Sequence, residues 1–169
     1  SKEAGLPLYR YAGGYREGQV PAYASGGYYA EGKGPADLAR EMQGYVEMGF
    51  QAVKTKVGGV PPKEDAVRVR VFREAVRPDV PVFLDANNAW PDAATAIWAV
   101  RHFEEYDPGW IEEPLMPDDI RGHAEVAAAV RMPVATGEIH ATRWEFQELV
   151  DKRAAAILQA DAGVCGGIT

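Results

Sequence analysis

Residues 109–119 read GWIEEPLMPDD, an apolar Trp-Ile pair followed by two adjacent glutamates and a proline. The apolar pair is typical of a short buried strand, and Pro114 ends the strand because proline cannot donate a ladder hydrogen bond. Two carboxylates at the end of a buried strand are costly unless another group balances their charge. We therefore compare the residues at the carboxyl end of each predicted strand.

The same alternation of short apolar segments and longer helical segments extends in both directions from this stretch. We expect strands at residues 20–25, 51–57, 80–87, 109–113, 133–138 and 155–161. The helical periodicity predicts helices at residues 35–50, 63–76, 93–105, 120–130 and 143–150. Strands that alternate with helices indicate right-handed crossovers and a parallel sheet, and hence an α/β fold.

The length of the repeat distinguishes between two α/β architectures. One strand and one helix recur about every 26 residues, and a closed barrel of eight such units needs about 250 residues, whereas the chain has 169. The alternative is an open, doubly wound nucleotide-binding sheet, but SGGYYAEGKG (25–34) contains no G-x-G-x-x-G and the chain has no GK[ST] loop. The sequence predicts a partial (β/α) TIM-type barrel of about six units, with the rest of the barrel absent from this chain.

Composition excludes several classes of partner. Hydrophobic residues make up 47% of the chain, which is enough for a core, and the net charge of −7 argues against binding to nucleic acid. We find no run of eighteen apolar residues and no basic leader, so we expect no membrane partner. The single cysteine, Cys165, rules out an internal disulfide and favours a reducing compartment, so we expect a cytoplasmic protein.

Acidic residues stand at four of the predicted strand ends, at a regular spacing. Asp85 is 27 residues before Glu112, Glu112 is 26 before Glu138, and Glu138 is 23 before Asp161. Each interval is about one strand-helix unit, so the carboxylates should lie at one level on adjacent strands. The carboxyl ends of the strands form the functional face of such barrels.

Strand alternation predicts which side each residue faces. Trp110 and Glu112 are in phase, so we expect Glu112 to point into the barrel mouth, while Ile111 faces the helices and Glu113 lies on the rim. The same argument places Val134, Thr136, Glu138 and His140 on one face.

Three carboxylates from neighbouring strands, Asp85, Glu112 and Glu138, would then converge. Strands are about 4.8 Å apart, and carboxylates that close either take up protons or share a cation. An oxygen-only site favours a hard ion, Mg²⁺ first, with Mn²⁺ or Ca²⁺ as alternatives. We therefore expect a divalent metal site.

Two lysines should face the same mouth from the preceding strand. Lys54 and Lys56 of the KTK stretch share a face, and a nearby divalent ion and a second lysine both disfavour the ammonium form of Lys56. The set would suit removal of a proton next to a carboxylate, with Lys56 as the base and the ion stabilising the enediolate. Taken alone, a KTK stretch is usually a solvated strand end, but groups at four consecutive strand ends favour function.

Several longer motifs resemble a known family. AVKTKVG, FLDANNAW, WIEEPLMPDD, TGEIHATRWEF and LQADAGVCGGIT are similar to the mandelate racemase subgroup of the enolase superfamily. Within that subgroup they look most like the acid-sugar dehydratases, of which rhamnonate dehydratase is one. The resemblance runs from about Val20 to Thr169, and GLPLYRYAGG resembles the segment that leads into the barrel. We therefore expect a lead-in segment over 1–19 and a partial barrel catalytic domain over 20–169.

The resemblance implies roles for particular residues. It implies that Asp85, Glu112 and Glu138 hold Mg²⁺, that Lys56 is the base, and that Lys54 helps to hold the substrate carboxylate. It also implies that Asn87 lies near metal or substrate and that Asp161 is half of an Asp-His dyad. From its position on the predicted strand, we expect His140 to be either a substrate contact or a rim residue. In proteins of this kind the dyad histidine lies on a seventh strand and the N-terminal part forms a capping domain, so the resemblance implies that both lie outside this chain.

Three functions remain open. The favoured one is a Mg²⁺-dependent dehydratase, a hydro-lyase that removes the proton alpha to the carboxylate of a sugar acid and expels the beta hydroxyl to give a 2-keto-3-deoxy acid. The motifs GEIHATRWEF and DAGVCGG favour this over a racemase or epimerase of the same superfamily. The third is a non-catalytic, metal-binding barrel fragment. The expected partner is a small sugar acid, and we expect the complete protein to form a homo-oligomer.

Overall fold

A computed structural model describes residues 2–14 and 20–167 as a parallel sheet backed by helices. Its six strands are hydrogen-bonded in chain order, from β1 to β6. The strands are β1 (Ala24–Gly26), β2 (Val53–Lys56), β3 (Val82–Asp85), β4 (Ile111–Glu112), β5 (Val134–Thr136) and β6 (Ile157–Leu158). This order, with every pair parallel, confirms the predicted α/β fold with partial-barrel topology.

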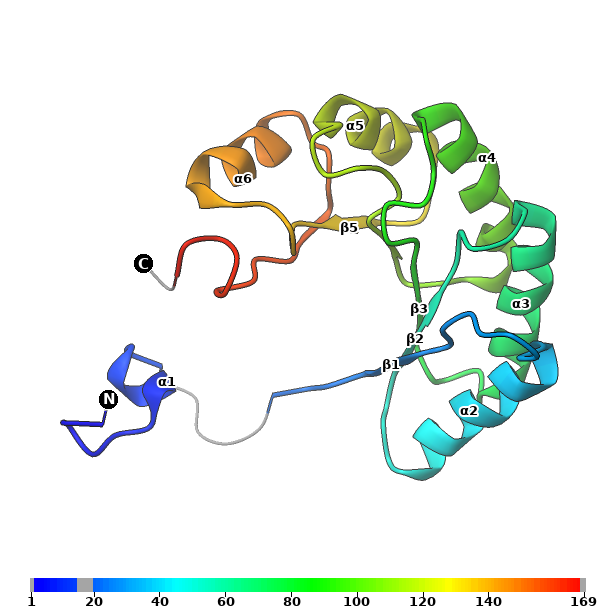
Figure 1. Ribbon diagram of the computed structural model, residues 1–169, viewed down its shortest axis with the longest axis horizontal. Helices are drawn as coiled ribbons and strands as arrows, with labels where there is room; N and C mark the ends of the chain where they lie inside the picture. Colours follow the sequence, from blue (N-terminus) through cyan, green and yellow to red (C-terminus); the bar gives the residue numbers. More distant parts are fainter. Residues whose placement is uncertain (1, 15–19, 168–169) are drawn as a thin grey trace.

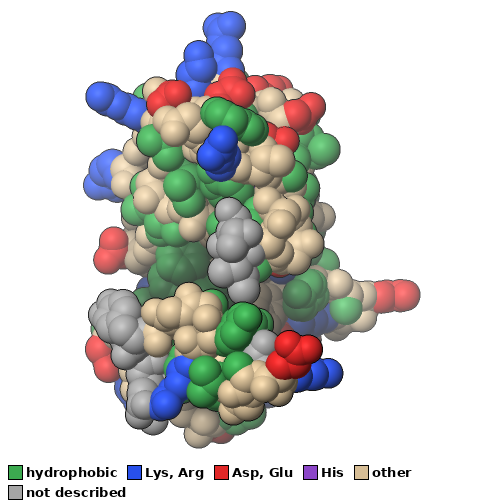
Figure 2. Space-filling model, turned by 90° about the vertical axis from the view of Figure 1, so that its left-hand side faces the viewer, with side chains coloured by type: hydrophobic (Ala, Val, Ile, Leu, Met, Phe, Trp, Pro, Cys, Tyr) green, Lys and Arg blue, Asp and Glu red, His purple; other side chains and the backbone are tan. Residues whose placement is uncertain are grey.

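The helices follow the strands one by one and lie on the outer side of the sheet. They are α2 (Pro35–Glu47), α3 (Pro62–Ala75), α4 (Ala93–Phe103) with the 3-10 turn η1 (Glu104–Tyr106), α5 (Ile120–Ala129) and α6 (Thr142–Asp151). A short helix, α1 (Leu8–Tyr11), precedes them. Figure 1 shows α2 to α6 as an arc around the strands, with the inner side open toward α1 and the C-terminal turn. Hydrophobic side chains gather in the hollow on this open side (Figure 2).

Local signals explain where these helices begin. Pro35 and Pro62 occupy the first positions of α2 and α3, where the missing N–H is not needed. The side chain of Asp92 caps α4 by accepting from Thr95 N, and that of Asp119 caps α5 by accepting from Gly122 N. The predicted helices are correct to within three residues at each end.

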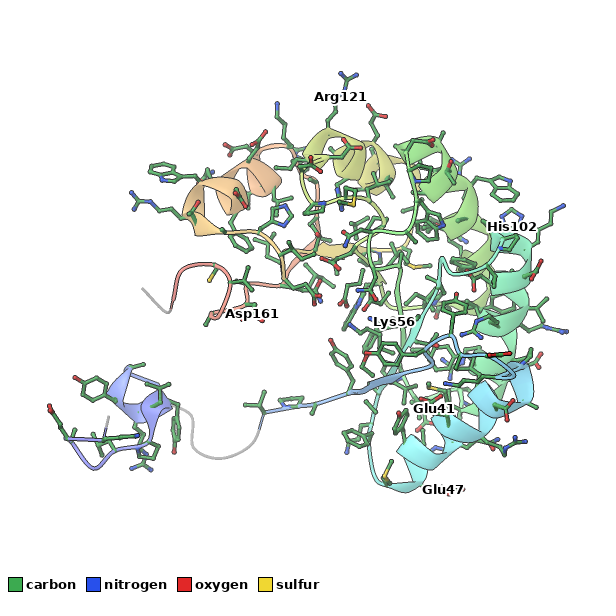
Figure 3. All side chains as sticks on the ribbon, viewed as in Figure 1. Glu41, Glu47, Lys56, His102, Arg121 and Asp161 are labelled. Carbon is green, nitrogen blue, oxygen red and sulfur yellow. The ribbon has the colours of Figure 1, made fainter. Side chains whose placement is uncertain are left out.

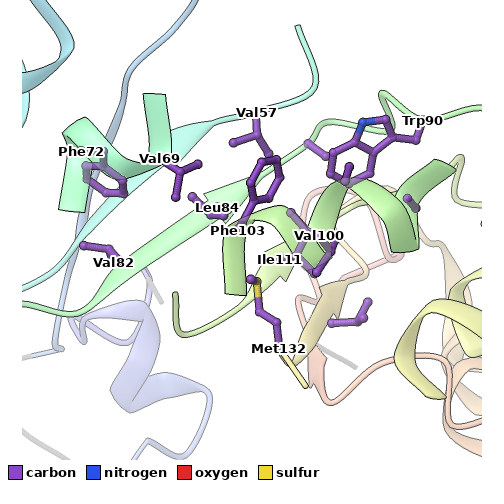
Figure 4. Packing of buried hydrophobic residues seen from close by; sticks show 14 of the residues in the cluster. Val57, Val69, Phe72, Val82, Leu84, Trp90, Val100, Phe103, Ile111 and Met132 are labelled. Atoms are coloured by element: carbon purple, nitrogen blue, oxygen red, sulfur yellow. The ribbon is translucent and has the colours of Figure 1, made fainter. Parts of the chain in front are cut away.

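The core lies between the outer face of the sheet and the helices. Leu84 and Ile111, paired in register on β3 and β4, are fully buried there, which confirms that Ile111 faces the helices. Phe72 of α3 and Phe103 of α4 are fully buried against this face. Figure 4 shows these side chains interdigitating, so the core fixes the strands and with them the positions of their carboxyl ends.

All six strands are shorter than predicted: β3 covers 82–85 rather than 80–87, and both edge strands are shorter as well. The prediction of β1 over 20–25 was wrong because pairing with β2 begins at Ala24, and β6 covers 157–158 rather than 155–161. A strand at an edge has only one neighbour, so its pairing extends only as far as that neighbour reaches. The predicted lead-in over 1–19 lies partly outside the described residues, as do Ile168 and Thr169.

Among the described residues, the structure contains no helix long and apolar enough to cross a membrane.

Candidate active site

Two lysines and two carboxylates meet at the carboxyl ends of β2, β3 and β4. Lys54 Nζ lies 2.5 Å from Glu112 Oε1 and 3.1 Å from Asp85 Oδ2, and Lys56 Nζ lies 2.6 Å from Asp85 Oδ2. Strand register explains the meeting, since Lys56 pairs with Asp85 and Asp85 pairs with Glu112 across adjacent strands. Figure 3 places Lys56 on the inner side of the arc. The structure thus brings together four residues selected from the sequence.

The ion pair between Lys54 and Asp85 is buried, and the pKa of each of these two groups is shifted. Burial alone would lower the pKa of Lys54, but its hydrogen bond to Glu112 and the charges of Asp85 and Glu112 outweigh this and raise it. Burial alone would raise the pKa of Asp85, but the hydrogen bond from Lys56 and the charges of both lysines lower it. These groups are therefore held in their charged forms.

Aromatic rings contact this group of two lysines and two acids, which we call the lysine pocket. Trp110 stacks on Phe83 with ring centroids 3.5 Å apart, and Trp110 Nε1 donates to Glu112 Oε2 at 3.2 Å. The second oxygen of Glu112 is therefore fixed by an indole, as expected from the common phase of Trp110 and Glu112. Tyr23 adds a ring whose centroid lies 5.5 Å from Lys54 Nζ.

Glu113 does not lie on the rim, and that prediction was wrong. Its side chain is fully buried, because its backbone has a φ of 42° and leaves the extended strand conformation immediately after Glu112. Burial, then the charges of Glu138, Asp85 and Glu112, raise the pKa of Glu113 to about 7. The Asn87 side chain opposes this shift, yet neither oxygen of Glu113 has a hydrogen bond of normal geometry. A fourth carboxylate thus belongs to the pocket.

Glu138 lies near the pocket because of a turn in the backbone, and not because of strand alternation as predicted. Glu112 of β4 pairs with Ala135 of β5, so these two residues face the same side of the sheet. Thr136 therefore faces the other side, and strand alternation would place Glu138 on that other side too, away from Glu112. Gly137, with a φ of 136°, breaks that alternation before Glu138. Glu138 is then partly exposed and close enough to Glu113 to raise its pKa.

The other predicted site residues lie at different depths. Asn87 is exposed beyond β3, where its backbone N–H donates to Asp85 Oδ1 at 3.0 Å. His140 is only 3% exposed, so it is not a rim residue, and neither of its ring nitrogens has a hydrogen-bond partner.

Asp161 does not end β6. The strand stops at Leu158, and Asp161 is an exposed turn residue that accepts from Gly163 N at 2.6 Å. The structure therefore does not join Asp161 to the lysine pocket, although both Asp161 and Lys56 lie on the inner side of the arc (Figure 3).

The donor chemistry of the pocket fits a hard divalent ion. Within the described residues, no three histidine, cysteine, aspartate or glutamate side chains stand ready to hold a metal, since the ammonium groups of Lys54 and Lys56 occupy places between the carboxylates. Glu113 nevertheless keeps two buried oxygens without hydrogen bonds, in a pocket whose other acids are also oxygen donors. The residues present therefore fit Mg²⁺ better than a softer metal.

Sequence reasoning missed the aromatic partners of the lysines. The ring of Tyr28 lies 5.3 Å from Lys56 Nζ, just as Tyr23 faces Lys54. The available signal was strand pairing, because Ser25, in phase with Tyr23, pairs with Lys54 in the register of β1 and β2.

Comparison with known proteins identifies the family to which the chain belongs. The family model described as "Enolase C-terminal domain-like" matches residues 37–169. The L-talarate/galactarate dehydratase of Salmonella typhimurium is 38% identical to the chain, across 100% of the chain and 42% of its own length.

Two solved structures have the same fold. The L-talarate dehydratase of a Polaromonas species, complexed with Mg and L-glucarate, superposes with a TM-score of 0.86 at 37% identity, over 99% of the chain and 46% of its own. A Streptomyces coelicolor racemase with bound magnesium superposes with a TM-score of 0.87 at 35% identity, over 95% of the chain and 44% of its own. The chain therefore spans less than half the length of these relatives.

The match covers β2, β3 and β4, which carry Lys54, Lys56, Asp85 and Glu112, and it also covers Glu138, which follows β5. The resemblance seen in the motifs is confirmed: this chain belongs to the enolase C-terminal domain-like family, and through it to the enolase superfamily.

Proposed function

We propose that the chain carries part of the active site of a Mg²⁺-dependent sugar-acid dehydratase. The observation that carries the proposal is the buried cluster in which Lys54 and Lys56 bridge Asp85 and Glu112 at the carboxyl ends of adjacent strands. The dehydratase relatives, one of them complexed with Mg and L-glucarate, support the choice of reaction and of substrate class.

In this proposal each group of the pocket has a distinct task. Asp85, Glu112 and Glu138 would hold the ion, which supplies positive charge beside the substrate carboxylate when bound. Lys54, whose ammonium is buried and held by two acids, is fixed in place to bind the substrate carboxylate. Lys56, at the end of β2 with a side chain 12% exposed, takes the proton from the alpha carbon.

The remaining predicted residues are assigned by position. Asn87 and His140 would contact the substrate or its surroundings, and Asp161 would orient a histidine supplied outside this chain. Cytoplasmic location and assembly into a homo-oligomer stay predictions.

A racemase or epimerase is the second candidate. The similarity to the Streptomyces racemase at a TM-score of 0.87 favours it, since both reactions begin with the same proton removal. The two differ in the next step: a dehydratase expels the beta hydroxyl, whereas a racemase returns a proton to the opposite face.

A screen of sugar acids with the complete protein and Mg²⁺ tests the proposal. We expect formation of a 2-keto acid, and in deuterated water we expect label at the alpha carbon of recovered substrate if proton removal is reversible. The Lys56→Ala variant should lose both. Exchange and inversion without 2-keto acid would identify a racemase, and binding of Mg²⁺ with neither exchange nor product would identify a non-catalytic protein.

A further inference from the structure

A second buried charged cluster lies behind the lysines, at the base of α3. The carboxylate of Asp65 is fully buried in the first turn of α3. Its Oδ1 accepts from Tyr29 Oη at 2.5 Å, and its Oδ2 accepts from Gly58 N at 2.6 Å. Since Tyr29 follows β1 and Gly58 follows β2, one side chain joins the turns after two adjacent strands.

Arg68 completes this cluster from the next turn of α3. Its Nη2 donates to Gly27 O at 2.9 Å, its Nε lies 3.5 Å from Asp65 Oδ1, and its guanidinium lies 4.2 Å from the centroid of the Tyr29 ring. Arg68 is only 8% exposed. A buried ion pair adds little net stability, but it strongly disfavours arrangements that separate the partners. The pair therefore fixes geometry.

Close packing leaves the two turns no room to shift. Gly27 has a φ of 68°, and a Cβ there would overlap Thr55 Oγ1. A Cβ on Gly59 would lie 2.5 Å from the Tyr29 ring. Glycine at these positions allows the turn after β1 to rest directly on β2 and its following turn.

The residues that this cluster holds are the chain neighbours of the proposed base. Lys56 ends β2 two residues before Gly58, and Tyr28, whose ring lies 5.3 Å from Lys56 Nζ, immediately precedes Tyr29. We propose that Asp65 is a positioning residue for Lys56, because by holding Tyr29 and Gly58 it sets the Tyr28 ring and the Lys56 ammonium relative to Asp85. This inference rests on the proposed function, in which Lys56 takes the proton.

Asp65 acts through other residues in this account. It has no exposed surface, and its hydrogen bonds go to Tyr29 and Gly58 rather than to the lysine pocket. Its removal should therefore displace the base and lower kcat, while substrate binding, and hence KM, changes little. Misplacement of a reacting group by about 1 Å can cost roughly a hundredfold in rate.

The test compares three variants of the complete protein with Mg²⁺. Asp65→Asn keeps the shape but can accept from only one of the two donors, and Tyr29→Phe removes only one donor. Asp92→Ala is the matched control, because it removes an exposed N-cap hydrogen bond, to Thr95 N of α4, and none of the hydrogen bonds of Asp65. Each variant is assayed for kcat and KM with a sugar acid as substrate, for hydrogen exchange of the Gly58 amide, and for labelling of Lys56 by an amine reagent.

We expect Asp65→Asn to lower kcat by about ten- to a hundredfold with KM within about twofold, and to speed exchange at Gly58. Tyr29→Phe should lower kcat in the same direction by less. Asp92→Ala should leave kcat and Gly58 exchange unchanged even though its thermal midpoint falls. An Asp65→Asn protein with unchanged kcat would overturn the inference, as would an equal loss in Asp92→Ala.

Two further outcomes are also decisive. If Asp65→Asn does not fold, Tyr29→Phe decides, and an unchanged kcat in that variant overturns the inference. If the wild-type protein turns over no sugar acid, the proposed function fails, and labelling of Lys56 then decides the positioning claim. Faster labelling in Asp65→Asn than in wild type supports it, and equal labelling overturns it.

Discussion

Replacing Lys54 by methionine tests whether the lysines balance the buried acids. Methionine has a side chain of similar length but no charge. Glu112 then loses its lysine partner, and Asp85 keeps only Lys56. The side chains of Lys54, Asp85 and Glu112 are 8%, 2% and 0% exposed. Removing one partner of such a buried pair costs about 3–5 kcal/mol. We expect urea unfolding of Lys54→Met without metal to show a loss of this size.

Magnesium should restore part of that loss. An ion that binds only the folded state stabilises it by about 2.7 kcal/mol at a concentration 100 times its Kd. We expect the gain on adding Mg²⁺ to be larger in Lys54→Met than in wild type, because the ion then replaces a missing cation and competes with one ammonium, that of Lys56, instead of two.

Lys33→Met is the matched control for this experiment. Lys33 pairs with Glu41 at 2.6 Å, but these side chains are 22% and 24% exposed, so its loss should cost about 1 kcal/mol or less and should not respond to Mg²⁺. The reasoning is refuted if Lys54→Met unfolds at the wild-type free energy, or if Lys33→Met loses as much.

Three further substitutions probe the scaffold by urea unfolding. Gly27→Ala should lose at least about 1–3 kcal/mol, because the new Cβ overlaps Thr55 Oγ1 at a φ of 68°, and a wild-type midpoint would contradict this. Phe103→Ala should lose about 3–5 kcal/mol, since a fully buried ring leaves a cavity. Burial, aided by His140, lowers the pKa of His123 below its ordinary value of 6.5. The unfolded chain therefore binds a proton first as the pH falls, and stability drops below about pH 6.5; His123→Gln should show a shallower drop, and an identical pH profile would exclude His123 as the source.

The fold could be predicted because its signals are local. Pro35 and Pro62 mark helix starts, and the alternation of Trp110 with Ile111 identifies the inner and outer faces of β4. Each of these signals depends on one residue and its immediate neighbours. Strand ends at the edges of the sheet depend instead on the reach of a partner strand, so β6 was predicted too long.

The sequence predicts where Glu113 and Glu138 stand along the chain but not which way their side chains point. Alternation holds as far as Glu112 and fails at the next residue, because Glu113 has a φ of 42°; the φ of 136° at Gly137 likewise redirects Glu138. A positive φ in a non-glycine residue is uncommon and is kept only when the surrounding structure enforces it. The prediction for Glu113 failed because sequence periodicity carries no information about such a reversal.

The two lysines of the pocket do not neutralise all of its acids. Glu113 and Glu138 join Asp85 and Glu112 as four acids, whereas Lys54 and Lys56 supply only two positive charges, so full ionisation would leave a formal charge of −2. In a buried site such an excess must be met by protons or by a cation. Burial, then the charges of Glu138, Asp85 and Glu112, raise the pKa of Glu113 to about 7, in keeping with this excess of negative charge. One divalent ion would match the deficit, so the pairing of the lysines with the carboxylates is compatible with the proposed metal site.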